Sequence, residues 1–193
     1  YRTGRMAVET ASNAMEVLGG DGYVRNFPTE RLLRDAQVLP IWEGTSNVLS
    51  LDLLRVLDRT AAEAALLGLV DDALAGVDHP VLEPLLGTVA RYRERLAAAI
   101  HAVVAADGAD AQHDAKALAD LVFDVVAASR LLESAQHRLD SENDARVAAV
   151  ARWFVRETLD GGDRGIGDGG ALSDATVDAV LRYARLLPEA FAG

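Results

Sequence analysis

One carboxylate in this sequence has neighbours that suit acid–base chemistry. Glu43 follows the apolar run at 38–42, Val-Leu-Pro-Ile-Trp, and precedes Gly44. Apolar neighbours keep water away from a carboxylate, which raises its pKa towards the range of a general base. A glycine beside it allows a backbone or a flat ligand to approach closely. These residue types therefore suit a carboxylate that accepts a proton from a bound substrate.

The residues that follow Glu43 suit an anion. Thr45, Ser46 and Asn47 precede an apolar pattern that starts at Val48 and predicts a helix. The first turn of a helix has free N–H groups and the positive end of the helix dipole, and both favour a phosphate. On its own, however, an acid beside a helix start is more often a plain cap than a catalyst. These residues alone leave both interpretations open.

The composition favours helices. Half of the 193 residues are hydrophobic but only 5 % are aromatic, and alanine, leucine and valine supply most of the apolar side chains. Such a balance favours helices over strands, and no segment alternates with period two for long enough to require a strand. The sequence therefore predicts an all-α fold in which antiparallel helices pack as a bundle.

Apolar spacing and end signals predict where the helices lie. Gly19-Gly20-Asp21-Gly22 ends the first helix, Pro40 breaks the chain before Glu43, and the glycine-rich segment 160–170 is a flexible loop. The predicted helices are 1–18, a short helix from Pro28, Ser46 to beyond Leu69, 80 to about 106, 111–139, a helix capped by Ser141 that runs to about 159, and a helix capped by Ser173 that ends before Pro188.

Charge and residue types exclude several classes of function. The net charge is −11, with 8 acids against 7 arginines in residues 1–60 and a net −10 in residues 61–193. An acidic surface repels phosphate backbones, so nucleic acids and anionic membranes are disfavoured partners. There is no cysteine, the four histidines share no ligand spacing, and no apolar run is long enough to span a membrane. We therefore expect no metal site and a cytoplasmic protein.

Three segments occur in order between residues 14 and 47. They read Ala-Met-Glu-Val-Leu-Gly-Gly-Asp-Gly-Tyr at 14–23, Pro-Thr-Glu-Arg-Leu-Leu-Arg-Asp-Ala at 28–36 and Ile-Trp-Glu-Gly-Thr-Ser-Asn at 41–47. Together they resemble the C-terminal helical region of the flavin-dependent acyl-CoA dehydrogenases. That family carries Gln-x-x-Gly-Gly-x-Gly-Tyr, Pro-x-Glu-Arg-x-x-Arg-Asp and Tyr-Glu-Gly-Thr at closely similar separations. One such segment would be weak evidence, but three in order are specific.

The resemblance implies catalytic and substrate-binding roles for two residues. Glu43 matches the catalytic base, which removes the α-proton of an acyl-CoA thioester while the β-hydride passes to FAD. Gly44 matches the backbone position that lies against the thioester. With this resemblance, Glu43 becomes a candidate base rather than a plain helix cap.

The resemblance also implies that five residues contact FAD. Thr45 and Asn47 match residues that touch the ribityl and pyrophosphate parts. Glu16, Gly19 and Gly20 match a segment that reaches the adenine half of an FAD held mainly by a neighbouring subunit. Glu16 stands where the family has glutamine, so this position loses its amide donors and places a charge near the nucleotide.

A second departure points to one branch of the family. Trp42 replaces the usual tyrosine, and together with Asn47-Val48 and the run Leu-Asp-Leu-Leu-Arg-Val-Leu at 51–57 it resembles the AidB-like, alkylation-response branch. That branch has an extra helical region after the dehydrogenase core, which here would be residues 61–193. In that branch the extension has been linked to DNA binding. The net charge of −10 argues against that role in this chain.

We therefore expect residues 1–60 to be the end of the dehydrogenase C-terminal bundle and residues 61–193 to be an acidic helical extension. The resemblance places further domains before Tyr1, so this fragment alone is expected to be inactive. It also implies a homodimer or homotetramer that passes electrons to an electron-transfer acceptor. The alternatives are a non-catalytic helical interaction or assembly module, in which Glu43 caps a helix, and, less favoured, a DNA-damage-response binding protein.

Overall fold

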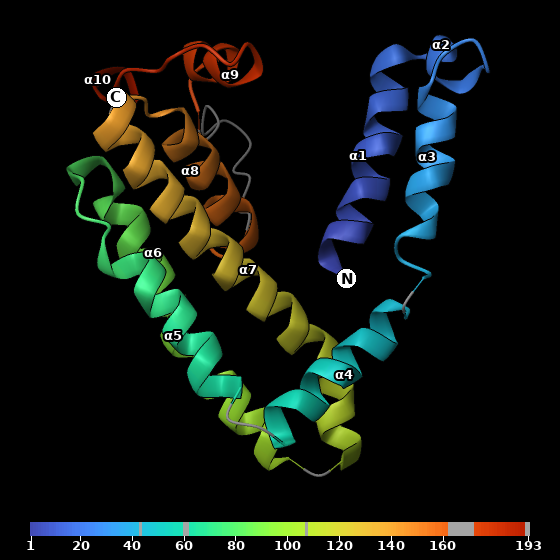
Figure 1. The fold of residues 1–193 in the computed structure, drawn as a ribbon, viewed down its shortest axis with the longest axis vertical. Coiled ribbons are helices and arrows are strands. Elements are labelled where there is room, and N and C mark those ends of the chain that lie inside the picture. The colour runs from blue at the N-terminus through green and yellow to red at the C-terminus, as the bar shows by residue number, and fades with distance from the viewer. Residues whose placement is uncertain (43, 60–61, 107, 162–171, 192–193) are drawn as a thin grey trace. The chain divides into compact units, whose positions relative to one another are not determined.

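The computed structural model describes residues 1–42, 44–59, 62–106, 108–161 and 172–191. All regular elements within these ranges are helical, which confirms the predicted all-α fold (Figure 1). They are α1 (Arg2–Leu18), α2 (Gly20–Tyr23), α3 (Thr29–Val38), α4 (Ser46–Arg59), α5 (Ala62–Ala75), the 3₁₀ helix η1 (Pro80–Leu82), α6 (Glu83–Ala105), α7 (Gly108–Glu142), α8 (Arg146–Thr158), α9 (Asp174–Leu181) and α10 (Pro188–Phe191).

The chain divides into two compact units. Unit 1 contains Tyr1–Arg59 and Val103–Asp120, and unit 2 contains Thr60–Ala102 and Leu121–Gly193. The long helices α6 and α7 each contribute to both units. Residues 103–120 are thus grouped with the N-terminal segment that carries the three motifs.

Two predicted segments reach residues that the structure does not describe. The sequence predicts one helix from Ser46 to beyond Leu69, and the structure describes α4 as far as Arg59 and α5 from Ala62, with residues 60–61 outside the described ranges. The predicted loop 160–170 lies almost wholly outside the described residues.

The cap predicted at Ser141 is wrong. Ser141 lies inside α7, where its hydroxyl donates to the His137 carbonyl at 2.6 Å. A serine can satisfy its hydroxyl in this way within a helix. At the start of α8, Asp144 instead accepts a hydrogen bond from the N–H of Arg146 at 3.0 Å. Ser173 does cap α9 as predicted, accepting from the N–H of Thr176, and α9 ends at Leu181, before Pro188, as predicted.

In unit 1, α1, α2 and α3 form a helical hairpin whose closed end depends on one glycine. A Cβ atom at Gly22 would lie 2.5 Å from the carbonyl oxygen of Met15, so α2 can pack this closely on α1 only without a side chain there. The Thr29 hydroxyl donates to the Gly22 carbonyl at 2.8 Å. At the open end, a Cβ atom at Gly4 would lie 3.3 Å from Leu39. Both ends of α1 therefore touch the α3 side of the hairpin.

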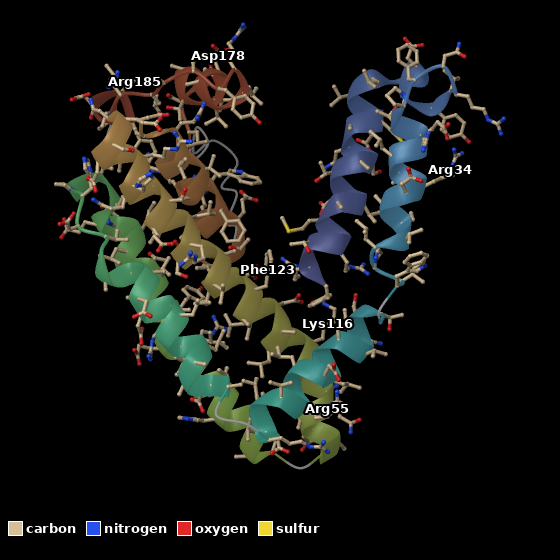
Figure 2. All side chains as sticks on the ribbon, in the orientation of Figure 1. Arg34, Arg55, Lys116, Phe123, Asp178 and Arg185 are labelled. Atoms are coloured by element: carbon tan, nitrogen blue, oxygen red, sulfur yellow. The ribbon has the colours of Figure 1, made fainter. Side chains whose placement is uncertain are left out.

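An acidic residue of α7 joins the start of the hairpin to the rest of unit 1. Asp120 accepts hydrogen bonds from the Tyr1 hydroxyl and from Lys116 Nζ, the latter at 2.8 Å, and Arg2 lies 3.5 Å away. Lys116 is labelled in Figure 2. Partial burial works against ionisation of Asp120, but the hydrogen bonds from Lys116 and Tyr1 hold its pKa below the usual value. This cluster therefore favours an ionised carboxylate.

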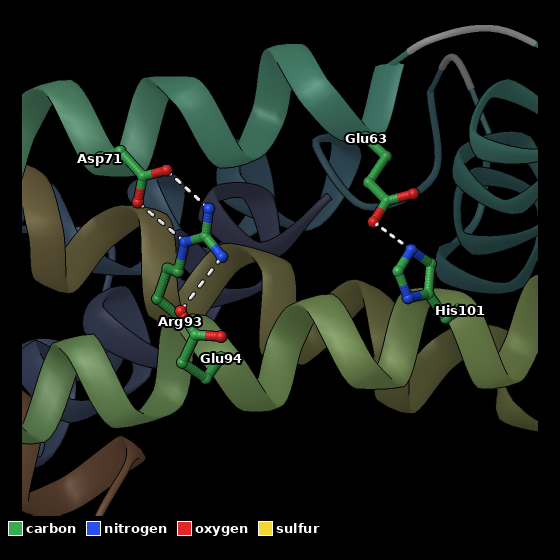
Figure 3. Close-up of polar contacts among 5 residues, drawn as sticks. All are labelled: Glu63, Asp71, Arg93, Glu94 and His101. Atoms are coloured by element: carbon green, nitrogen blue, oxygen red, sulfur yellow. Dashed lines mark hydrogen bonds and ion pairs between the residues drawn. The ribbon is translucent and has the colours of Figure 1, made fainter.

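Unit 2 has a dense apolar core. Its most completely buried large side chains are at 0 or 1 % exposure and include Leu82, Leu96, Ile100, Val125, Leu132 and Val155. Outside this core, α5 and α6 are joined by polar pairs. Arg93 donates to both carboxylate oxygens of Asp71 at 2.8 and 2.6 Å, and His101 lies 2.8 Å from Glu63 (Figure 3). The helices of unit 2 are thus held together by apolar packing in the core and by polar side-chain pairs outside it.

Buried polar side chains connect the turns of unit 2. The Gln136 side-chain oxygen accepts from the N–H groups of Asp78 and His79 at 3.1 and 2.9 Å, which ties the α5–η1 turn to α7. Asp144, only 4 % exposed, also accepts from the N–H of Leu186 at 3.0 Å. Because each of these buried groups has a partner, the turns can pack without an unsatisfied polar atom.

Candidate functional site

The loop between α3 and α4 presents its apolar side chains to solvent. Leu39, Ile41 and Trp42 are 55, 62 and 72 % exposed. Glu43, the predicted base, lies outside the described residues. The apolar side chains that were expected to exclude water from this carboxylate are therefore themselves exposed to solvent in this chain. A raised pKa at Glu43 stays a prediction, and it requires a further surface that covers this loop.

Gly44 occupies a backbone conformation that favours glycine. Its φ angle is 126°, and a Cβ atom there would lie 3.3 Å from the side chains of Val48 and Leu49. The glycine is thus required by the local turn, whatever it contacts in function. The carbonyl of Thr45 accepts from the N–H of Leu49 at 3.0 Å, which places Thr45 at the start of α4.

The side chains of Thr45 and Asn47 are both exposed at this helix start. Ser50, one turn further on, is 2 % exposed and donates instead to the carbonyl of Ser46 at 2.6 Å. The first turn of α4 therefore offers a hydroxyl, an amide and free backbone N–H groups to an external ligand.

Glu16, Gly19 and Gly20 form a second exposed set, at the C-terminal end of α1. Gly19 ends the helix with φ at 60°, and its N–H donates to the Glu16 carbonyl at 3.1 Å. A Cβ atom at Gly19 or Gly20 would have nothing within 4 Å, in contrast to Gly22. The two outer glycines are therefore not needed for packing, and their lack of side chains leaves room for a ligand.

The structure does not bring the two predicted sets together. The loop that leads to Gly44 begins at Leu39, against Gly4 in the first turn of α1, whereas Gly19 follows its last residue. The 17 residues of α1 rise about 25 Å along the helix axis. A small molecule cannot contact both ends. Only an extended ligand, or two separate ligands, could use both sets.

The second motif has a structural explanation. On α3, Glu30 pairs with Arg34 at 2.6 Å and Arg31 pairs with Asp35 at 3.5 Å, both one helical turn apart. Such pairs stabilise a helix by about 0.3–0.5 kcal/mol each. The Glu-Arg-x-x-Arg-Asp pattern thus supports α3 and does not by itself define a ligand site.

Sequence reasoning missed the positioning roles of Gly22 and Thr29. The sequence shows three glycines between 19 and 22, and nothing in their spacing separates the buried one from the two exposed ones. Across the described ranges no group of three or more histidine, aspartate or glutamate residues could hold a metal ion. Within the same ranges, no helix is both long enough and apolar enough to cross a membrane.

Comparison with known proteins identifies the part of the chain that carries the motifs. Residues 1–57 match the family described as "Acyl-CoA dehydrogenase, C-terminal domain". Residues 1–57 are thus similar to the C-terminal domain of the acyl-CoA dehydrogenases. The match contains all three motifs and ends inside α4. It confirms the resemblance that the motifs indicated.

Individual dehydrogenases match a part of the chain of similar length. The chain is 58 % identical over 53 residues to "Acyl-CoA dehydrogenase family member 11" of Caenorhabditis elegans, covering 28 % of the chain and 9 % of that protein. It is 50 % identical over 50 residues to "Putative acyl-CoA dehydrogenase AidB" of Escherichia coli (strain K12), covering 26 % of the chain and 9 % of that protein. It is 50 % identical over 42 residues to "Acyl-CoA dehydrogenase" of Bacillus subtilis (strain 168), covering 22 % of the chain and 11 % of that protein.

The matched segment spans about a tenth of the length of these dehydrogenases. AidB is among the similar proteins, as Trp42 and the run at 51–57 indicated. No solved structure is significantly similar to the chain. The similarity covers the hairpin, the following loop and most of α4, and the residues beyond them are not part of this match.

Proposed function

We propose that this chain supplies the general base and part of the FAD site of an acyl-CoA dehydrogenase. The observation that carries the proposal is the family match over residues 1–57, which includes Glu43 within its motif. Glu43 would accept the α-proton of an acyl-CoA thioester. The backbone of Gly44 would lie against the thioester and orient that carbon towards the base.

The residues at both ends of α1 fit a dinucleotide. Thr45 and Asn47 would hold its ribityl and pyrophosphate parts, and Glu16, Gly19 and Gly20 would contact its adenine half. All five are exposed, and the two glycines leave open space. Bound FAD would accept the β-hydride of the substrate. Because α1 separates the two sets, they would hold distant parts of one FAD or two FAD molecules in an oligomer.

The exposed loop indicates that the site needs further protein. Leu39, Ile41 and Trp42 would be covered in the whole enzyme, and that cover would exclude water from Glu43 and raise its pKa. We propose that the whole enzyme is a cytoplasmic homodimer or homotetramer that passes electrons to an electron-transfer acceptor. Its substrate class would be acyl-CoA thioesters.

The base is tested in the full-length protein with Glu43→Gln. We expect the variant to retain FAD, while acyl-CoA-dependent bleaching of the flavin absorbance slows by at least about 10²-fold, since amides do not accept protons at neutral pH. Asp35→Asn, which removes an exposed acid paired with Arg31, is the control and should bleach like the wild type. Undiminished bleaching in Glu43→Gln would rule out the base.

FAD binding is tested separately from turnover. Thr45→Val and Gly20→Val should each weaken FAD retention, measured by flavin absorbance after gel filtration, because one loses a hydroxyl and the other fills open space. A full-length wild type that is colourless and takes up no FAD would favour the assembly-module alternative. Tight, salt-sensitive DNA binding in a mobility-shift assay would favour the alternative of a DNA-damage-response binding protein.

A further inference from the structure

A cavity lies in unit 1 between α4 and residues from the end of α6 and the start of α7. Its volume is about 400 Å³, within the range of about 300–1,000 Å³ that is usual for small-molecule sites. Residues of α4 form one wall, and residues from the end of α6 and the start of α7 form the other. None of the residues predicted to bind FAD or the thioester lines it.

The deeper wall of this cavity is aliphatic. Val103 and Ala111 are 8 and 7 % exposed, and Leu54 is half-buried between solvent and the interior. Leu51, Val104 and Ala106 extend the same apolar surface. A ligand that fits this surface must carry an alkyl or aryl group, because the buried wall offers no side-chain polar group to pair with.

The rim of the cavity carries a positive charge. Arg55, labelled in Figure 2, and Arg59 are one helical turn apart, so their side chains share a face of α4. Asp58 is the only acid in the lining. Arg55 pairs with Asp52. Among the described residues Arg59 has no ion-pair partner, although the chain as a whole has a net charge of −11. A guanidinium without a carboxylate at the edge of an apolar wall suits an external anion.

We propose that this cavity binds a small amphipathic carboxylate. The alkyl chain would lie on Leu54, Val103 and Ala111, and the carboxylate would accept hydrogen bonds from Arg59, with Gln112 opposite as a further donor. Apolar area and charge then act together, as in small-molecule sites with a few convergent polar groups. Binding at this site does not depend on Glu43 or on FAD, so this proposal can be tested independently of the proposed function.

The test uses the 193-residue chain and three probes in isothermal titration calorimetry. Decanoate should bind saturably with one site per chain. Decyltrimethylammonium, which has the same tail and the opposite charge, should not bind, and acetate, which has the same head without the tail, should not bind. Absence of saturable decanoate binding would overturn the proposal, as would equal binding of the cationic probe.

Two variants and one control locate the site. Arg59→Met should weaken decanoate binding by about tenfold or more, since a charged hydrogen bond is lost. Ala111→Leu should abolish it by filling the cavity. Arg182→Met, which removes an exposed arginine paired with Asp178 in unit 2, should leave binding unchanged. Circular dichroism checks the fold. If both Arg59→Met and Ala111→Leu bind decanoate like the wild type, the cavity is not the site.

Discussion

The α1–α3 hairpin and the helices of unit 2 are held together in different ways. None of the residues of α1 is buried, and α3 buries only Thr29. In unit 2, by contrast, Leu82, Leu96 and Leu132 are fully buried. The segment with family similarity thus has almost no core of its own, whereas the helices beyond the family match have a complete one.

This difference separates chemistry from stability within the chain. The motif-bearing segment exposes large apolar side chains such as Val17 at 86 % and Trp42 at 72 %. A single exposed apolar residue needs no explanation, but a hairpin that buries no large apolar side chain gains little from the hydrophobic effect. We infer that unit 2 carries most of the stability and that the hairpin contributes residues to a site which other protein surface completes.

The largest expected effect lies in the core of unit 2. Leu96→Ala should destabilise the chain by about 2–5 kcal/mol, because it leaves a cavity in a fully buried site. Val17→Ala, on the exposed face of α1, should change stability by less than about 0.5 kcal/mol. Urea unfolding measures both free energies.

Hydrogen exchange sharpens the same comparison. In the wild type, amides of α6 and α8 should be protected to nearly the global unfolding free energy, and those of α1 and α3 much less. Equal amide protection in α1 and α6 would show that the hairpin has a core comparable with that of unit 2. A loss of unfolding free energy in Val17→Ala as large as that in Leu96→Ala would show the same.

An intermediate effect is expected inside the hairpin. Gly22→Ala should destabilise the α1–α3 pairing by about 1–3 kcal/mol, because its Cβ would meet the Met15 carbonyl at 2.5 Å. Gly20→Ala should have little effect, because its Cβ meets nothing within 4 Å. Exchange protection of α1 and α3 distinguishes the two variants. Similar protection in both would remove the distinction between the packing glycine and the open ones.

The smallest effect concerns the pair that joins α5 to α6. Hydrogen bonds from Arg93 hold the pKa of Asp71 below its usual value, so the pair stabilises the fold at pH values above the unfolded pKa of about 4. That contribution is lost as the pH falls through the lower, folded pKa. Because Asp71 is half exposed, Arg93→Met should cost only about 0.2–1 kcal/mol at pH 7.

Urea unfolding of wild type and Arg93→Met between pH 7 and pH 3 checks this prediction. The difference between the two proteins should be constant down to about pH 4 and should shrink below it. Arg91→Met, which breaks an exposed contact with Asp160, serves as the control and should cost less. A difference that grows on acidification would contradict the assigned sign.

The sequence by itself determined the helical class, several helix ends and the similarity of residues 1–57 to acyl-CoA dehydrogenases. Helix formation depends on neighbours a few residues apart, so apolar spacing predicted α1, Pro28 predicted the start of α3, and Ser173 was correctly predicted to cap α9. The three motifs span only residues 14–47, and their order and separation can be read without a structure. The roles of Glu43 and of the FAD-binding residues remain predictions from that resemblance.

Only the tertiary structure decided which of these residues are buried and which lie close together. Gly22 and the outer glycines look alike in sequence, but only Gly22 meets another helix. Trp42 belongs to an apolar run, yet it is 72 % exposed. The two sets of predicted FAD-binding residues lie at opposite ends of α1. The cavity proposed to bind a carboxylate is lined by residues of α4 and by residues from 103 onward. Burial and proximity depend on contacts between distant segments, which local sequence patterns do not encode.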